Sequence, residues 1–340
     1  MASSQALPDF DDLPPVEGMP KGCAWGLFDK DGKKDLLGTL NLLTPEVVRG
    51  AAAEVKDGVS ISLNLPINLL ESVPMPGRKK PEHNIMTLQE AGLSAGHGFD
   101  DEVSFNTQCC TQWDSLVHWQ HQPSGLAYNG FKPTKELLSV NSTSENILPT
   151  LDHWHSRGGL VGRGVLIDYK EYAAAKGIDY DPLNGYRITV QDIEDVAKHQ
   201  GVEFKTGDIL LIRTGFADAL LSQHPGEVFS KLAVGLVGIH GSEDTARWFW
   251  NKHFAAAATD TPAFEAFPPL KEDGTVASLE DLVLHPYLLS LFGMPIGEYW
   301  NLKDLGDYCK EAGRYAFMLS SSPLNVPGLV GSPPNALAIL

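Results

Sequence analysis

Hydrophobic positions recur with two periods along the chain, and the shorter one predicts strands. Apolar and polar residues alternate over 59–65 (VSISLNL), the pattern of a strand with one buried face. Residues 209–213 (ILLIR) form an almost unbroken apolar run, which favours a strand buried on both faces. Two more strands are expected, one beginning at Gly164 (GVLIDYK) and one over 254–260. Strands are therefore expected in both halves of the chain.

Helical periods lie before and between these strands. In residues 188–201, Ile193, Val196 and Ala197 share one face of a helix that Thr189 can cap. Another helix is expected after Thr44, where Pro45 suits the first helical position, and a third over 242–253. Because strands alternate with helices, the sequence predicts an α/β fold: a single-domain mixed β-sheet with flanking helices.

Proline, glycine and aspartate mark the segments expected to lack regular structure. Residues 1–22 are expected to be an extended N-terminal arm, and residues 71–84 a loop. No linker or internal repeat divides the rest of the chain, so residues 23–340 are expected to be one domain.

The charge of the chain restricts its partners. Lys and Arg number 26 against 43 Asp and Glu, a net charge of −17, which argues against a nucleic acid or an anionic membrane as partner. No apolar run approaches the ~18 residues of a membrane span, and the N-terminus lacks the basic and apolar regions of a signal peptide. The four cysteines form no disulfide framework. We therefore expect a cytoplasmic protein that acts on a small molecule.

Two generic motifs are weak. Residues 92–96 (GLSAG) match a nucleophile elbow, but no apolar strand precedes them, so a glycine-rich loop is the better interpretation. Gly162 and Gly164 resemble a fragment of a dinucleotide-binding fingerprint, yet they precede the expected strand instead of following it. Neither motif supports a nucleotide or serine-hydrolase function.

Residues 105–121 (FNTQCCTQWDSLVHWQH) concentrate polar side chains of catalytic types between two tryptophans. Gln108, Gln112 and Asp114 can converge if the segment turns, and His118 follows them. A carboxylate, an imidazole and amide groups beside aromatic rings are what a hydrolytic pocket for a small molecule needs. A polar surface loop with buried tryptophans is the alternative.

The spacing of this segment resembles the signature H-x-G-T-H-x-D-x-P-x-H of the cyclase family of hydrolases, which includes kynurenine formamidase and isatin hydrolase. Gln108 falls on the first His, Thr111 and Gln112 on the T-H pair, Asp114 on the Asp, and His118 on the last His. The resemblance spans roughly residues 37–335, because further blocks follow in the family's order. They are GRGVLIDY (162–169), ITVQDIEDV (188–196), GDILLIRTG (207–215), AATDTPAFE (257–265), and the pair His285 and Glu298.

The sequence departs from the family at two metal-ligand positions, where both histidines are glutamine. The resemblance implies one divalent metal held by Asp114, His285 and Glu298, with Gln108 and Gln112 as oxygen donors or as holders of water. Glutamine is a poor substitute for histidine on zinc, and an oxygen-rich set favours Mn²⁺ or Mg²⁺ over Zn²⁺. Loss of the metal, with acid–base chemistry alone, is the alternative.

The resemblance also implies roles for other residues. His118 is expected to shuttle a proton, and Asp114 and Glu298 to take part in catalysis. Trp113, Trp119 and Thr261 are expected to contact the substrate, with packing or capping as their alternatives. The expected activity is metal-assisted hydrolysis of an amide, lactam or lactone in a small molecule, by a homodimer or homotetramer. A metal-free cyclase, dehydratase or isomerase, and a ligand-binding relic without activity, remain as alternatives.

Overall fold

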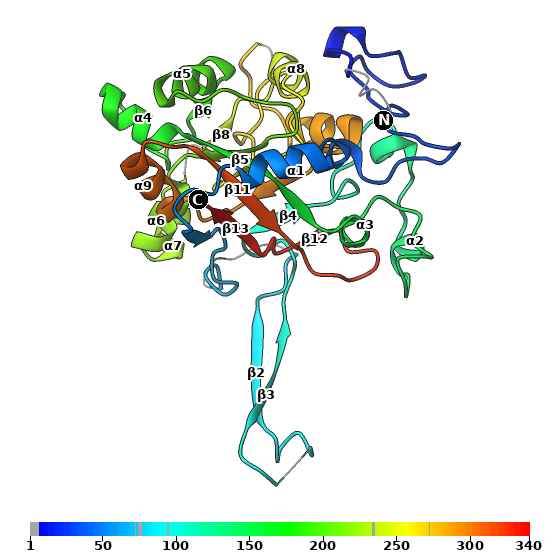
Figure 1. Ribbon diagram of the computed structural model, residues 1–340, viewed down its shortest axis with the longest axis vertical. Helices are drawn as coiled ribbons and strands as arrows, with labels where there is room; N and C mark the ends of the chain where they lie inside the picture. Colours follow the sequence, from blue (N-terminus) through cyan, green and yellow to red (C-terminus); the bar gives the residue numbers. More distant parts are fainter. Residues whose placement is uncertain (1–6, 72, 74–76, 94, 233–234, 272) are drawn as a thin grey trace.

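A large mixed sheet dominates the computed structural model, which describes residues 7–71, 73, 77–93, 95–232, 235–271 and 273–340 (Figure 1). Among the described residues the sheet has nine strands, in the order β1-β13-β11-β5-β7-β9-β10-β4-β12. They are β1 (Ser60–Ser62), β4 (Gln112–Asp114), β5 (Leu160–Asp168), β7 (Ile209–Arg213), β9 (Ala256–Thr259), β10 (Ile296–Glu298), β11 (Ala316–Ser321), β12 (Gly331–Ser332) and β13 (Ala336–Ile339).

The sheet is parallel in its centre and antiparallel towards both edges. Strands β5, β7, β9 and β10 run parallel, and β4 joins β10 in the antiparallel sense. Two further pairs lie outside it: β2 (Glu82–Thr87) with β3 (Phe99–Ser104), and β6 (Arg187–Ile188) with β8 (Gly238–Ile239). The prediction of an α/β fold with a mixed sheet is confirmed.

Helices cover the sheet, and α4, α5 and α8 gather along the upper side in Figure 1. The α-helices are α1 (Pro45–Ala52), α2 (Lys135–Leu138), α3 (Asp152–Ser156), α4 (Tyr169–Lys176), α5 (Val190–Gln200), α6 (Phe216–Ser222), α7 (Pro225–Ser230), α8 (Glu243–Asn251) and α9 (Lys303–Ala312). Shorter helical turns are η1 (Phe10–Asp12), η2 (Gly38–Leu42), η3 (Tyr128–Gly130), η4 (Leu279–Asp281) and the π-helix η5 (Pro286–Phe292).

The predicted helices begin at the predicted caps. Thr44 accepts a hydrogen bond from the backbone of Val47 at the start of α1. Thr189 and Asp192 form a reciprocal capping box at the start of α5, and Ser242 caps α8. Each cap satisfies backbone N–H groups that the first turn of a helix leaves without partners.

The core lies on both faces of the sheet, as the apolar run in β7 predicted. Leu210 and Ile212 pack with α5 and α8 in one cluster, whereas Ile209 and Leu211 pack with α9 in another. This alternation follows from the strand geometry, in which successive side chains point to opposite faces. Residues of β7 are fully buried on both sides.

Two predicted boundaries need correction. The strand expected to begin at Gly164 begins four residues earlier, because 160–163 pair with β11. The loop expected over 71–84 ends in β2, where 82–84 pair with β3; residues 72 and 74–76 of that loop lie outside the described residues. A proline- and glycine-rich stretch could not reveal a partner strand some twenty residues downstream.

The described part of the expected N-terminal arm packs on the domain. Phe10 is fully buried, contacts the rings of Tyr287 and Phe292, and donates its N–H to Asn251 at 2.7 Å. Burial of one large aromatic side chain contributes about 2 kcal/mol, enough to hold a short segment. Residues 1–6 lie outside the described residues, and the boundary at residue 22 stays a prediction.

The two weak motifs gain no support. Gly162 and Gly164 lie inside β5, where a Cβ would meet the side chains of Leu43 and Phe317, so these glycines serve strand packing. Ser94, the central residue of the GLSAG motif, lies outside the described residues.

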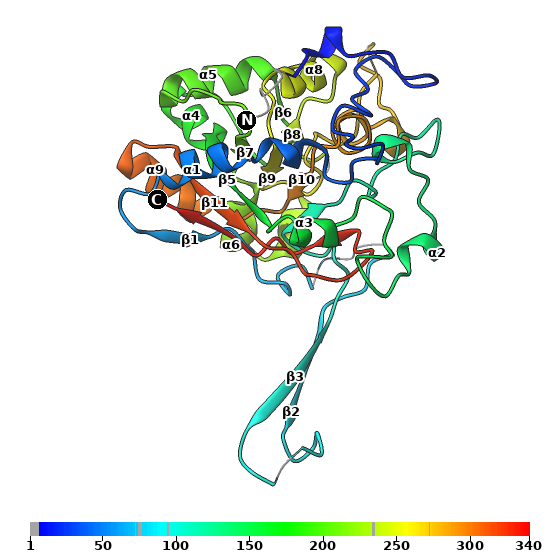
Figure 2. The same cartoon turned by 45° about the vertical axis from the view of Figure 1, so that its right-hand side comes forward.

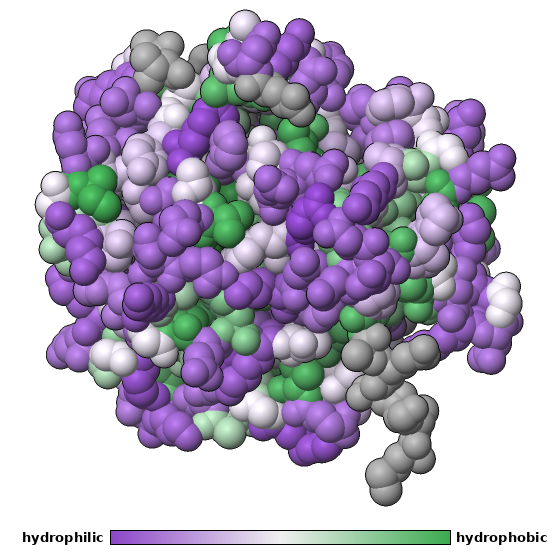
Figure 3. Space-filling view, turned by 90° about the horizontal axis from the view of Figure 1, so that it is seen from above, coloured by the Kyte–Doolittle hydropathy of each residue, from purple (hydrophilic) through white to green (hydrophobic). Residues whose placement is uncertain are grey.

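The β2–β3 hairpin projects away from the body of the molecule in both views (Figures 1 and 2). The upper face of the molecule is mostly hydrophilic, with scattered apolar side chains, in keeping with the charged composition (Figure 3). No helix among the described residues is both long enough and apolar enough to cross a bilayer.

Candidate active site

Strand alternation brings the polar residues of the 105–121 segment to one face of the sheet. In β4, Gln112 and Asp114 are two residues apart and therefore share a face. Glu298 of β10 lies directly opposite Gln112 in the antiparallel register, so its side chain joins them. All three side chains are buried, at the point where the parallel centre of the sheet meets its antiparallel edge.

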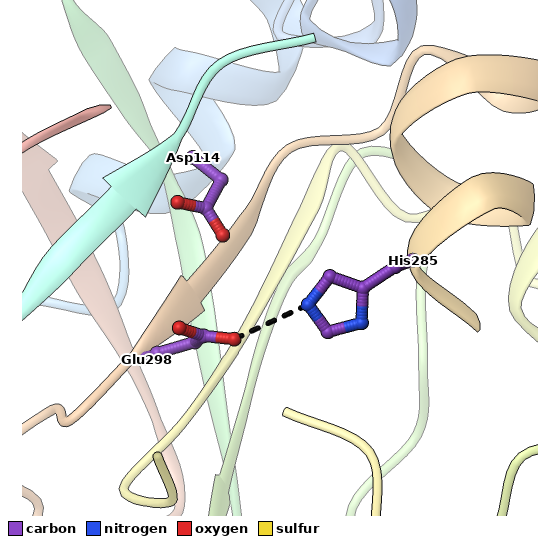
Figure 4. Close-up of side chains that lie close together, drawn as sticks. All are labelled: Asp114, His285 and Glu298. Atoms are coloured by element: carbon purple, nitrogen blue, oxygen red, sulfur yellow. Dashed lines mark ion pairs between the residues drawn. The ribbon is translucent and has the colours of Figure 1, made fainter. Parts of the chain in front are cut away.

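His285 completes the group from outside the sheet, just before the π-helix η5 (Figure 4). Asp114, His285 and Glu298 each offer a ligand atom, and these atoms lie within 4.8 Å of one another. His285 Nε2 is 3.4 Å from Glu298 Oε1. The structure thus brings together the three residues predicted as metal ligands.

Glu265 holds the other side of His285. Its Oε1 accepts hydrogen bonds from the backbone N–H of His285 at 2.8 Å and from Nδ1 at 2.9 Å, and Glu265 is buried. A buried carboxylate on Nδ1 fixes the ring and leaves Nε2 towards Asp114 and Glu298, as in metal sites with an oriented histidine. Sequence reasoning missed this role, because Glu265 stood only at the end of a family block, 20 residues from its partner.

Burial and neighbouring charges shift the protonation of the cluster. Burial disfavours the charged form of His285, but hydrogen bonds and charges from Glu265 and Glu298 outweigh it and raise the pKa to about 10. Burial also raises the pKa of Glu298, and the negative charge of Asp114 adds to the shift. Two buried carboxylates beside one imidazole form a site that favours a positive charge between them.

The amide groups of Gln108 and Gln112 bind the carboxylates. Gln108 Nε2 donates to Asp114 Oδ1 at 2.5 Å, and Gln112 Nε2 donates to Glu298 Oε2 at 2.6 Å and to Gln108 Oε1 at 2.5 Å. A Cβ at Gly331 of β12 would lie 2.4 Å from Gln108 Nε2, so a larger residue there would displace the Gln108 amide. The two glutamines form a hydrogen-bonded chain along the ligand cluster.

The donor set fits a divalent cation. Asp114 Oδ2 and Gln112 Oε1 are buried and have no hydrogen-bond partner among the described residues. An unpaired buried acceptor costs about 1–3 kcal/mol, and a cation between the carboxylates would satisfy such oxygens. Gln112 Oε1 remains available as a ligand, whereas Gln108 Oε1 already accepts a hydrogen bond.

Two other predicted residues lie beside this cluster. His118 Nε2 is 3.9 Å from Asp114 Oδ1, and its side chain is 21% exposed, so it borders both the carboxylate and solvent. Trp119 packs edge-on against the ring of His285, with ring centroids 5.7 Å apart. Its Nε1 is buried without a partner among the described residues. These positions suit a proton shuttle and an aromatic wall.

Trp113 lies on the core side of the sheet, whereas Thr261 lies beside the residue that follows Glu298. Trp113 is on the opposite face of β4 from Asp114, fully buried, and packs against Trp154 and Trp300. Thr261 is also fully buried, and its carbonyl accepts from the N–H of Tyr299, the residue after Glu298. The alternation of side chains in β4 accounts for the position of Trp113, and the expected substrate contact of Thr261 stays a prediction.

Comparison with known proteins identifies the family. The family model described as "Putative cyclase" matches residues 51–266. The crystal structure of a novel cyclase is 30% identical, covers 94% of this chain and 99% of its own, and superposes with a TM-score of 0.75. The chain belongs to the cyclase family. The family resemblance found in the sequence is therefore confirmed.

More distant structures share the cyclase fold. An isatin hydrolase bound to the product analogue thioisatinate is 17% identical, with a TM-score of 0.56, over 85% of this chain and 94% of its own. Isatin hydrolase A from Ralstonia solanacearum is 15% identical, with a TM-score of 0.55, over 87% of this chain and 97% of its own. Among curated protein sequences, none matches this cyclase.

Proposed function

We propose that this cyclase is a hydrolase that opens an amide, lactam or lactone bond in a small molecule. The observation that carries the proposal is the buried group of Asp114, His285 and Glu298, with His118 at its edge. Similarity of fold to two isatin hydrolases supports hydrolysis as the reaction class. The ring of Trp119 beside His285 favours flat, aromatic substrates.

A divalent metal would be held by Asp114, His285 and Glu298, with Gln112 Oε1 as a fourth donor. When bound, such an ion polarises the carbonyl and lowers the pKa of water. The set has one nitrogen donor and otherwise oxygen donors, so we favour Mn²⁺ or Mg²⁺ over Zn²⁺. Gln108 Oε1 already accepts a hydrogen bond from Gln112, so we assign Gln108 the role of orienting Asp114.

The protein's own residues would position and move the proton. His118 borders both Asp114 and solvent, so its imidazole can take a proton from the attacking water and return it to the leaving nitrogen or oxygen. Glu265 keeps the ring of His285 in one orientation. Burial of Glu298 and Asp114 excludes competing water from the carboxylates.

A metal-free cyclase, dehydratase or isomerase is the second candidate. The hydrogen bonds from Gln108 to Asp114 and from Gln112 to Glu298 favour it, because they partly satisfy both carboxylates without a cation. A ligand-binding relic is the third, but unpaired buried Asp114 Oδ2 is costly in a site that has no reaction to perform.

Turnover before and after chelation tests these candidates. We would screen formamides, lactams and lactones with protein loaded with Mn²⁺, and repeat the assay after chelation and after restoring the ion. Hydrolysis that disappears with the metal and returns with it is the expected result. Activity that survives complete chelation would favour the metal-free candidate, and binding of the compounds without turnover would favour the relic.

We also propose that the protein is cytoplasmic and assembles as a homodimer or homotetramer. The four cysteines are free and buried, which suits a reducing compartment. The β2–β3 hairpin has a solvent-exposed apolar face: Ile85, Phe99 and Val103 are 62%, 77% and 53% exposed. A second copy of the chain is the partner that we propose for this face.

A further inference from the structure

A basic groove lies on this acidic protein, formed by the turn at residues 30–34 and by helix α3. One cavity of about 430 Å³ is lined by the three lysines of the turn and by Arg157. A second cavity of about 790 Å³ is also lined by Lys30, Leu37 and Arg157, so the two cavities adjoin. We call these two cavities the basic groove. It shares no residue with the candidate active site.

The turn places two lysines opposite each other. Lys30 and Lys33 exchange backbone hydrogen bonds of 3.2 and 2.9 Å across the two residues Asp31 and Gly32, which have φ angles of 52° and 71°. Directly opposite residues in such a turn point to the same side, and like charges there repel each other. An arrangement that costs stability is explained if an anion binds between the two ammonium groups.

Helix α3 supplies the other wall of the groove. His153, Ser156 and Arg157 stand at i, i+3 and i+4, so their side chains fall on one face, and all three line the cavity. His153 Nε2 is buried without a hydrogen-bond partner among the described residues. Imidazole, hydroxyl and guanidinium groups on one face can donate several hydrogen bonds to one oxyanion.

Lys30, Lys33, Lys34 and Arg157 lack carboxylate partners within the described part of the chain, whereas Arg49, which lines the second cavity, pairs with Glu46. Arg157 is half-buried and donates only to backbone carbonyls, those of Leu43 and Gly159. Lys34 donates to the carbonyl of Asn129. Asp35 also lines the groove, but its carboxylate accepts from the backbone of Leu37 and Gly38. Asp31 is the other lining acid, and it is exposed, so cations outnumber acids in the groove.

We propose that the basic groove binds a phosphoryl group, free or carried by a small metabolite. A phosphoryl group carries up to two negative charges and three acceptor oxygens, and can therefore engage several of these donors at once. Arginine recognises it with paired N–H groups and lysine as a point charge. The side chains of Phe28, Leu36 and Leu37 line the same cavity and can pack against an organic part of the ligand.

Titration calorimetry with inorganic phosphate, phenyl phosphate, benzoate and phenol tests the proposal. The test variant is K30Q/K33Q, because both lysines are exposed and neither side chain is hydrogen-bonded to another described residue. The matched control is K176Q/K198Q, which removes the same charge from exposed positions on α4 and α5. Neither variant touches the candidate active site, so an anion bound there would leave both variants equal.

We expect the wild type to bind phenyl phosphate more tightly than benzoate, and not to bind phenol. K30Q/K33Q should raise the dissociation constant about tenfold, since each exposed ion pair contributes up to about a factor of five, whereas the control should stay near the wild-type value. If inorganic phosphate binds as tightly as phenyl phosphate, the free ion is sufficient as ligand. If phenyl phosphate binds more tightly, the ligand is a phosphoryl group carried by an organic molecule. Equal binding by both variants, or no phosphate binding by the wild type, would overturn the proposal.

Discussion

At the scale of single residues, the hydrogen bonds of the site separate ligands from orienting groups. Gln108 and Gln112 use their N–H groups on the carboxylates, so only the oxygen of Gln112 stays free for a cation. Glu265, in contrast, acts on the site through His285 alone. These differences lead to separate expectations for each position.

His118→Ala should lower kcat by about 10²–10⁴ while the fold and the metal content stay unchanged, because general acid–base catalysis contributes a factor of that size. His121→Ala, three residues away and hydrogen-bonded to Ser124 instead, is the matched control. Steady-state kinetics on the best substrate from the screen would measure both. Unchanged turnover in His118→Ala would exclude it as the proton shuttle.

Glu265→Gln should weaken metal affinity about 10–100-fold, the usual effect of removing a carboxylate that orients a histidine ligand. The buried amide keeps the size of the side chain, and thermal unfolding would show whether the fold survives. Metal titration followed by calorimetry is the measurement. If affinity were retained, His285 would not depend on Glu265 for its orientation.

The site was predictable from sequence as far as local spacing and the family resemblance reach, the latter for His285 and Glu298. Gln108, Gln112, Asp114 and His118 lie within one segment, so their convergence could be expected. Glu265 pairs with His285 through the tertiary fold, and no local pattern signals that contact. Trp113 was expected at the site because it stands between Gln112 and Asp114. Successive side chains of a strand point to opposite faces, so its own side chain lies in the core.

At the scale of elements, caps and apolar runs predicted most boundaries. Helices α1, α5 and α8 begin where Thr44, Thr189 and Ser242 indicated, because a cap is a local interaction. The β2–β3 hairpin was not predicted, because its strands are stabilised by pairing with each other and not by a pattern within either segment. Helix α6 depends on a cap from further away, the carboxylate of Asp260.

Asp260 gives helix α6 a pH-dependent contribution to stability. Its carboxylate accepts from Thr214 and Gly215, yet complete burial raises its pKa from 3.8 to about 6. The folded state therefore binds this proton more tightly than the unfolded state. The stabilisation of the fold by protonation of Asp260 is complete below about pH 4 and is lost as the pH rises through about 6.

Asp260→Asn removes the titration, which isolates this effect. The difference in free energy of unfolding between wild type and variant should be about 1 kcal/mol larger at about pH 5 than at about pH 7.5. Urea unfolding at both pH values would measure it. A difference that does not change with pH would contradict the raised pKa.

At the scale of the whole molecule, the projecting hairpin is the surface that we expect to join copies of the chain. The strand register puts Ile85, Phe99 and Val103 on one face, together with His83 and Asp101, whose side chains are hydrogen-bonded. A two-fold copy would offer the same apolar residues and the same hydrogen-bonded pair in return.

Ile85→Ser with Phe99→Ser should therefore reduce the mass of the assembly, measured by light scattering after gel filtration. Met86→Ser is the control, because Met86 lies on the other face of the hairpin and loses a similar apolar side chain. A double variant with the wild-type mass, or a monomeric wild type, would contradict the predicted homodimer or homotetramer.

The metal content of the purified protein tests the central claim most directly. Elemental analysis of the wild type and of Asp114→Ala, each incubated with Mn²⁺, Mg²⁺ and Zn²⁺ and freed of excess ion, should find one divalent ion per wild-type chain. The variant should retain little or none, because one of the three clustered ligands is gone. A wild type that holds no metal after this treatment would contradict the proposed metal-assisted hydrolase.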